Sequence, residues 1–251
     1  MPLPSYGFDP TESSIPWTAL KEQGHQVVFA TPHGKVAQAD RRMLTGEGLG
    51  LWKKVLMADA VAIQAYRQME LSTEFQHPIS YEDFDFNQYD ALLLTGGHDK
   101  GMREYLESPL LQELVVHFFE ASKPVGAICH GTLLAARSTS ETTGRSALWG
   151  RKTTALTQKQ EMVAYYMTRL YLDDYYRTYN IPMEVELRSY LEKDSDYFSG
   201  PGLVIPLRRD SPEHLERGFT VLDNNYLSAR WPGDAHRFAS EFVELLQKSS
   251  N

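Results

Sequence analysis

The chain has 251 residues, 42% of them hydrophobic, so it can bury a sizeable core as one large α/β domain or two small ones. Its 25 Lys and Arg residues face 33 Asp and Glu residues, and the net charge of −8 excludes the basic face that nucleic-acid binding needs. The single cysteine cannot form an intramolecular disulfide, and no stretch reaches the roughly 20 apolar residues of a membrane span. Without a basic, apolar leader at the N-terminus, the sequence predicts a cytoplasmic protein with no membrane partner.

The first predicted elements are a helix over residues 9–20 and a buried strand over residues 25–30, HQVVFA. Three hydroxyl residues are candidate caps of this helix: Thr11, Ser13 and Ser14. A doubly wound sheet normally has a strand before its first helix, but only residues 1–6, with two prolines, precede this one. The first strand is therefore predicted to be very short or lost.

Residues 35–87 leave the simple strand and helix alternation, and we interpret them as an insertion. A helix is expected over about residues 51–69, and the acidic, aromatic residues 81–89 are expected to form a surface connection.

The following unit begins with a buried strand over residues 90–95, DALLLT, and continues into a loop that opens with Gly96 and Gly97. Two adjacent glycines at the carboxyl end of a strand let backbone N–H groups approach a ligand closely. A helix over about residues 102–121 is predicted to follow.

Residues 123–136, KPVGAICHGTLLAA, predict a buried strand over residues 124–128, a tight turn and a helix. The turn carries Cys129, the one cysteine of the chain. A lone cysteine is commonly a small buried hydrophobic residue. At this turn, however, the side chain leaves the end of the sheet beside the positive end of a helix, which favours a thiolate. The turn is therefore predicted to present a nucleophile.

The remaining chain predicts further elements of an α/β fold and one broken stretch. They are a strand over residues 150–156, a Met- and Tyr-rich helix over 157–176, mixed residues 181–191, a stretch over 198–205 broken by glycine and proline, strands over 218–223 and 226–229, and a closing helix over 236–247. One compact unit with an inserted segment is the simplest account.

Several groups are placed to assist Cys129. His130 is its neighbour and is a candidate proton carrier, while Glu12 and Glu161 follow from topology as carboxylates near the carboxyl ends of strands. Because the carboxyl ends of parallel strands share one edge, the N–H groups of Gly97 and His130 are predicted to face a developing oxyanion.

These motifs resemble the ThiJ/PfpI superfamily, which has the class I glutamine amidotransferase-like fold. The resemblance rests on AICHG around Cys129, LLLTGGHDKG at residues 92–101 and the Glu12 of DPTES, and it spans nearly the whole chain. It implies a flavodoxin-like, three-layer, doubly wound and mostly parallel α/β sheet in a single domain over residues 1–251, with the insertion at about 35–87. Two features look more like the glyoxalase III and heat-shock chaperone branch than the minimal, shorter branch of the superfamily. They are the long segment between the second and third strands and the extra chain after the elbow, which is the strand, turn and helix around Cys129.

By resemblance, Cys129 is the nucleophile, His130 its partner, Glu12 the carboxylate that bonds the thiol, and Glu161 the acidic third member. The sequence departs from the family at its nearly absent first strand. It also lacks the distant His-x-Glu pair of the glutamine amidotransferases, since His236 is followed by Arg and Phe. Glutaminase chemistry is therefore disfavoured.

The resemblance implies a glutathione-independent glyoxalase, a lyase of the D-lactate dehydratase type that acts in stress response as a cytoplasmic homodimer. It needs no cofactor and no metal, and its substrate is methylglyoxal or a similar 2-oxoaldehyde. Two alternatives stay open: a holdase chaperone that binds clients through the aromatic residues 165–179, and a cysteine-dependent peptidase or amidase.

Overall fold

The computed structural model describes residues 1–201 and 209–249. Its largest sheet has four strands in the order β5 (Leu92–Leu94), β6 (Val125–Ile128), β8 (Tyr226–Ala229) and β7 (Thr220–Asp223). The first three run parallel, and β7 pairs antiparallel with β8 through a tight hairpin.

Two shorter parallel pairs accompany this sheet. They are β1 (Tyr6–Phe8) with β3 (Gln38–Ala39) and β2 (Ala30–Thr31) with β4 (Ile79–Ser80). Asp9 N donates to Gly96 O at 2.8 Å, which joins the end of β1 to the end of β5. The prediction of a very short first strand is confirmed, because β1 has three residues.

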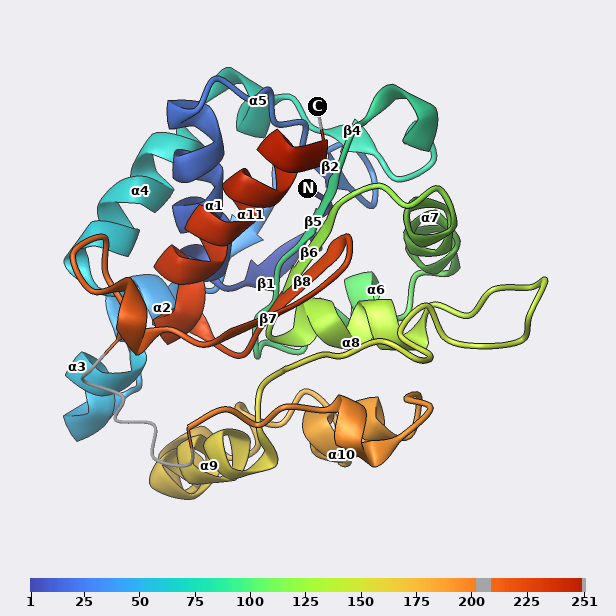
Figure 1. The fold of residues 1–251 in the computed structure, drawn as a ribbon. Coiled ribbons are helices and arrows are strands. Elements are labelled where there is room, and N and C mark those ends of the chain that lie inside the picture. The colour runs from blue at the N-terminus through green and yellow to red at the C-terminus, as the bar shows by residue number, and fades with distance from the viewer. Residues whose placement is uncertain (202–208, 250–251) are drawn as a thin grey trace.

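Helices cover both faces of the sheet, which gives the predicted three-layer α/β fold (Figure 1). One layer contains α1 (Pro10–Glu22), α4 (Ala60–Glu70) and α11 (Ala235–Ser249), with α11 packed on β6 and β8. The other contains α6 (Met102–Leu106), α7 (Pro109–Glu120) and α8 (His130–Arg137), with α8 packed on β5 and β6. The core therefore lies on both sides of β6, the strand that leads to Cys129.

Residues 35–87 hold several short elements besides β3, α4 and β4. These are α2 (Arg41–Thr45), α3 (Lys53–Leu56) and α5 (Thr73–Gln76). Single 3-10 turns complete the structure at Gly50–Trp52, Phe86–Gln88, Asp194–Asp196, Leu215–Arg217 and Pro232–Asp234.

Two long predicted helices are each broken in the structure. The helix expected over residues 51–69 divides at residues 57–59, where Met57 is extended and Asp59 caps α4 by accepting from Ala62 N at 2.9 Å. The helix expected over residues 102–121 divides at Pro109, which occupies the first turn of α7 and cannot continue a helix. Both errors come from a cap or proline within an otherwise periodic run.

The strand predicted over residues 25–30 is much shorter in the structure, and the strand predicted over residues 150–156 is wrong. Of residues 25–30, Ala30 alone lies in β2. Residues 150–156 form no strand and make one isolated bridge, between Thr153 and Tyr197.

The cap of the first helix is also corrected, because Asp9 takes that position in place of the three hydroxyl residues. The closing hairpin and helix are confirmed, and part of the broken stretch over 198–205 lies outside the described residues.

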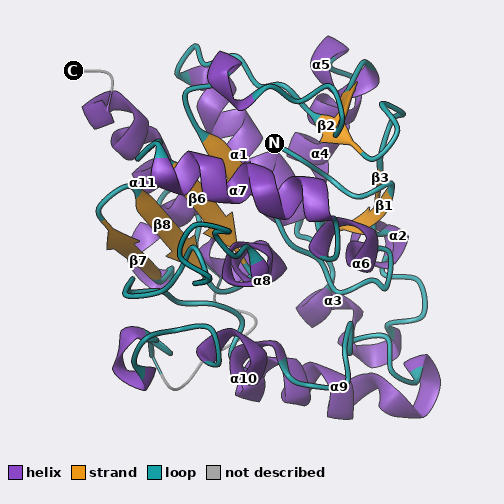
Figure 2. Ribbon diagram, turned by 90° about the vertical axis from the view of Figure 1, so that its right-hand side faces the viewer, coloured by secondary structure: helices purple, strands orange, loops and turns teal. Residues whose placement is uncertain are grey.

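The segment after the elbow helix lies across the edge where β5 and β6 end. It contains α9 (Gln158–Leu172) and α10 (Met183–Arg188), which lie below the sheet in Figures 1 and 2. Arg137 at the end of α8 forms an ion pair with Glu186 of α10 at 2.7 Å. Tyr175 and Tyr176, just after α9, are buried in a small second core against Met43 and Leu49. These tyrosines therefore serve as packing residues.

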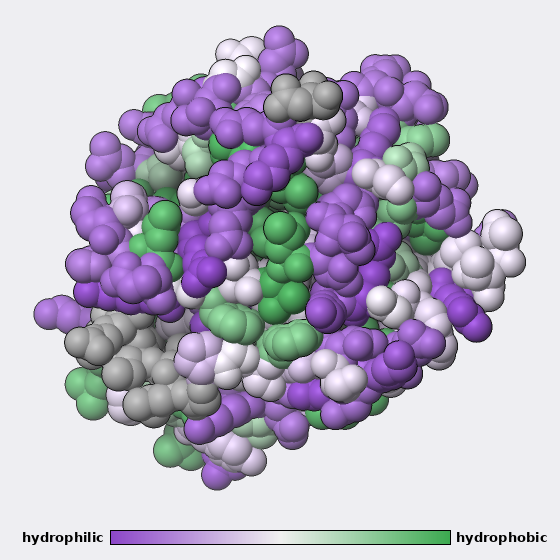
Figure 3. Space-filling view, viewed as in Figure 1, coloured by the Kyte–Doolittle hydropathy of each residue, from purple (hydrophilic) through white to green (hydrophobic). Residues whose placement is uncertain are grey.

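The face drawn in Figure 3 is mostly hydrophilic, with an apolar strip over the strands between α11 and α7. No helix in the described ranges is both long enough and apolar enough to span a bilayer.

Candidate active site

Cys129 stands at a strained turn between β6 and α8. Its backbone angles are φ 53° and ψ −126°, a region that non-glycine residues rarely adopt. The turn is held because Cys129 N donates to Ala229 O at 3.1 Å and Thr132 N donates to Cys129 O at 3.0 Å. A Cβ on Gly131 would lie 2.3 Å from Leu94 O, so the helix can approach β5 only with glycine there. The predicted strand, turn and helix are confirmed.

Glu12 reaches the thiol from the first turn of α1. Asp9 orients this turn, because its Oδ1 accepts from Thr11 N at 2.8 Å and from Glu12 N at 3.1 Å. Glu12 is fully buried, and within the described chain neither carboxyl oxygen has a hydrogen bond of ordinary geometry. Burial, followed by the Asp9 charge, raises the pKa of Glu12 well above its usual range. The Cys129 thiol is near enough to lower that pKa, but its effect is smaller.

The surroundings of the sulfur oppose the predicted preference for a thiolate. Burial, followed by the charges of Glu12 and Asp9, raises the pKa of the Cys129 thiol well above its ordinary value. The N–H of His130 at the helix start lowers that pKa, as expected, but the other causes outweigh it. A raised pKa favours the thiol over the thiolate, so a base that accepts the proton would activate the sulfur for attack.

His130 and His98 lie on the other side of the sulfur. The distance from Cys129 Sγ to His130 Nδ1 is 3.5 Å, and the rings of His98 and His130 meet edge to face with centroids 5.4 Å apart. Burial, followed by the charges of His98 and Arg137, holds the pKa of His130 well below 6.5, and burial lowers the pKa of His98 to about 4. Both imidazoles are therefore neutral near pH 7.

Sequence reasoning missed His98 as a member of the site. Donor atoms of His98, Cys129 and His130 all lie within 4.8 Å of one another, a set that could hold a metal ion. The signal was its position directly after Gly96 and Gly97, since that loop and the elbow share one edge of the sheet. The absence of a metal requirement stays a prediction.

Glu161 lies on α9 and interacts elsewhere. Its carboxylate forms an ion pair with Arg177 at 3.3 Å and accepts from Met183 N at 2.9 Å, which ties α9 to the start of α10. Among the residues described, no hydrogen bond or ion pair joins Glu161 to Cys129 or His130. The structure therefore brings together Cys129, His130 and Glu12. Glu161 lies instead in the segment of α9 and α10 that covers the site.

The glycine pair packs tightly against the nucleophile. A Cβ on Gly96 would lie 2.7 Å from both Glu12 Oε2 and His130 N, and 2.8 Å from Cys129 Cβ. A Cβ on Gly97 would lie 2.6 Å from Gly7 O. Only glycine fits at these two positions, because a side chain would collide with the neighbouring atoms. The oxyanion role of the Gly97 and His130 N–H groups stays a prediction.

Gly96→Ala is expected to destabilise the protein by about 1–3 kcal/mol through overpacking and, in a reaction that Cys129 carries out, to lower turnover about 10²-fold by displacing Glu12 or Cys129. Denaturant unfolding and steady-state kinetics measure the two effects. Gly144→Ala is the control, because a Cβ there meets nothing within 4 Å and only the positive φ of 66° adds strain. Gly96→Ala with full activity would contradict the close packing.

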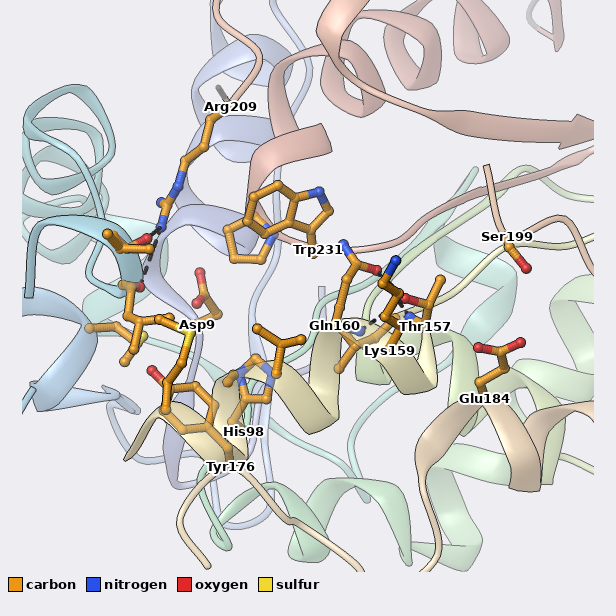
Figure 4. Close-up of a pocket in the computed structure, with 18 of the residues that line it drawn as sticks. Asp9, His98, Thr157, Lys159, Gln160, Tyr176, Glu184, Ser199, Arg209 and Trp231 are labelled. Carbon is orange, nitrogen blue, oxygen red and sulfur yellow. Dashed lines mark hydrogen bonds between the residues drawn. The ribbon is translucent and has the colours of Figure 1, made fainter. Parts of the chain in front are cut away.

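A cavity of about 320 Å³ opens beside the site, between α9, α3 and the chain at Trp231. Figure 4 shows Asp9, His98, Tyr176 and Arg209 around one end, with Thr157 and Glu184 toward the other. Cys129 is fully buried, and His98 is the wall residue that belongs to the cluster around its sulfur.

Comparison with known proteins shows what this chain is similar to. The sequence pattern of a family described as ThiJ/PfpI family-like matches residues 3–201. An uncharacterized protein of Schizosaccharomyces pombe is 35% identical over 118 residues, and this match covers 46% of the chain and 43% of that relative, less than half its length. Deglycase PfpI of Pyrococcus furiosus is 22% identical over 240 residues, 96% of this chain and 94% of that protein. The crystal structure of glyoxalase III from Candida albicans matches with a TM-score of 0.62 at 20% identity, over 95% of this chain and 88% of that one.

Proposed function

The chain belongs to the ThiJ/PfpI-like family, and we propose that it is a cofactor-independent glyoxalase III-like enzyme that converts a 2-oxoaldehyde to a 2-hydroxy acid. One observation carries the proposal: a fully buried carboxyl group, Glu12, lies against the thiol of Cys129 at a strained turn. Burial, followed by the Asp9 charge, raises the pKa of Glu12, so in its ionised form this carboxylate is a stronger base than an exposed one, which suits the exchange of a proton with the thiol.

In the first step, Glu12 accepts the thiol proton as the sulfur of Cys129 attacks the aldehyde carbon. A C–S bond forms, the carbonyl electrons move to oxygen, and Glu12 returns the proton there to give a hemithioacetal. The N–H groups of Gly97 and His130 would stabilise the oxygen while it is charged.

In the second step, Glu12 or His130 removes the proton from C1 and returns it to C2 through an enediol, while the hydroxyl proton on the C1 oxygen passes to the oxygen on C2. His130 is suited to this transfer because its neutral Nδ1 lies 3.5 Å from the sulfur. The product is a 2-hydroxy thioester. Water then attacks the thioester carbon, the C–S bond breaks, and the hydroxy acid and the free thiol are released.

The experiment is a glutathione-free assay of the purified protein with methylglyoxal, with lactate measured by chiral chromatography. Turnover without added metal or thiol supports the proposal. A parallel panel of peptide and amide substrates tests the hydrolase alternative, and a glycated amine tests the deglycase activity for which the Pyrococcus relative is named. Release of an amine from these substrates, without formation of lactate from methylglyoxal, would contradict the glyoxalase assignment.

The holdase alternative depends on exposed apolar side chains. Tyr166, Leu170 and Tyr171 of α9 are exposed, whereas Tyr175 and Tyr176 are buried. Suppression of client aggregation that is unaffected by loss of Cys129 would favour that alternative. A single domain with the insertion at about 35–87, the homodimer, the cytoplasmic location and the role in stress response belong to this proposal as well.

A further inference from the structure

The cavity beside the site is larger and more apolar than methylglyoxal requires. Its volume is about 320 Å³, within the range of pockets that hold drug-sized ligands. Its apolar walls include Leu56, Leu156, Val163, Ala164, Met167 and Trp231. Methylglyoxal carries one methyl group, so it would leave most of this wall in contact with water.

The two ends of the cavity differ in chemistry. At one end are Asp9 and His98, and His98 lies within 4.8 Å of the Cys129 sulfur through its ring nitrogen. From there the apolar wall extends along α9 to Thr157 and Glu184 (Figure 4). A ligand whose carbonyl group faces the thiol would therefore direct its substituent along the apolar wall.

Arg209 adds a polar anchor at the reactive end. Its Nη2 donates to Val55 O at 3.1 Å and to Leu56 O at 3.3 Å, whereas Nη1 is buried with no partner among the described residues. Its charge also lowers the pKa of Asp9, which places the two side chains near each other. A buried N–H that lacks an acceptor beside an apolar cavity matches a ligand oxygen, either a carbonyl or the carboxylate of a product.

We propose that this cavity binds the aliphatic chain of a 2-oxoaldehyde with a long apolar substituent, and that Arg209 Nη1 donates to an oxygen at the reactive end of that substrate. This inference rests on the proposed function for turnover, but the binding it describes does not. Each methylene that moves from water into the apolar wall increases affinity about fourfold. A chain of several methylenes therefore gives a large preference over methylglyoxal.

The first test compares 2-oxooctanal with methylglyoxal in the same glutathione-free assay. We expect kcat/KM to be at least about tenfold higher for 2-oxooctanal, which needs only two of its five extra methylenes to be buried. Val163→Trp fills the wall of the cavity and is expected to remove this preference, so that 2-oxooctanal and methylglyoxal are converted with similar kcat/KM. Leu170→Trp is the matched control, since Leu170 lies on the same helix and is 90% exposed. Equal kcat/KM values for the two aldehydes in the wild-type protein would overturn the proposal.

The second test measures binding alone and separates the two proposals. The probe is 2-octanone, a ketone of the same chain length that the reaction cannot convert. Equilibrium dialysis should detect its binding to the wild-type protein, unchanged affinity in Leu170→Trp, at least tenfold weaker binding in Val163→Trp, and about fivefold weaker binding in Arg209→Gln, the value of one hydrogen bond. If neither aldehyde is converted but 2-octanone binds in this pattern, the proposed function fails and the apolar site stands. If methylglyoxal is converted and 2-octanone does not bind, the apolar site is wrong and the proposed function stands.

Discussion

Replacement of Cys129 with alanine is expected to lower turnover of the 2-oxoaldehyde by at least about 10³-fold, because no other group in the site can form the hemithioacetal. Lactate formation under substrate saturation measures the loss. The thiol is fully buried, so the variant leaves a small gap and should unfold within a few degrees of the wild-type protein.

Cys129→Ser provides the control for shape. It retains a group of similar size that donates and accepts hydrogen bonds, but an alcohol is a much weaker nucleophile than a thiol, so it should also be inactive. If either variant keeps more than a tenth of the activity while folded, the sulfur is not the nucleophile and the proposed function is wrong.

Glu12→Gln is expected to lower kcat about 10²–10⁴-fold, the usual contribution of a positioned general base. Glutamine has the shape of glutamate but cannot accept the thiol proton at neutral pH. Steady-state kinetics across pH 6 to pH 9 measures the effect.

Glu161→Gln is the matched control and decides which carboxylate acts with Cys129. Glu161 bonds Arg177 and Met183 N, so its loss should destabilise the cover over the site by about 1–3 kcal/mol while kcat changes less than about threefold. The reverse result, with Glu161→Gln inactive and Glu12→Gln active, would assign the acidic role to Glu161.

Glu12→Gln also changes the titration of the Cys129 thiol in a definite direction. The Glu12 charge is among the causes that raise the pKa of Cys129, so its removal lowers that pKa. A larger share of the sulfur is then thiolate at any pH below the wild-type pKa. The rate of alkylation by iodoacetamide should therefore rise at lower pH in Glu12→Gln than in the wild-type protein, and a midpoint shifted to higher pH would contradict the arrangement.

The sequence predicted the strand, turn and helix around Cys129 because local signals specify all three. Residues 125–128 are an unbroken small and apolar run, and Gly131 meets the need for close helix packing. Glu12 could be placed because a helix that follows the first strand must begin at the same edge of the sheet. The closing hairpin was predictable since Asn224 and Asn225 form a turn between two alternating runs.

The remaining features depend on tertiary contacts that no local pattern records. Residues 150–156 have strand composition, but Thr154 N donates to the side chain of Ser228, so they follow β8 without a regular ladder. The thiol was expected to be ionised because a helix end was visible in the sequence, whereas its complete burial was not. His98 was missed because its ring meets His130 only after two loops converge.

The complete burial of Cys129 also affects how readily peroxide oxidises its sulfur. Peroxide attacks the thiolate and not the thiol, and it must reach the sulfur to do so. Burial, followed by the charges of Glu12 and Asp9, raises the pKa of the Cys129 thiol, so a smaller share of the sulfur is in the form that peroxide attacks. In the proposed reaction the proton moves to Glu12 as the carbonyl arrives, so the form of the sulfur that peroxide oxidises would be formed mainly during turnover.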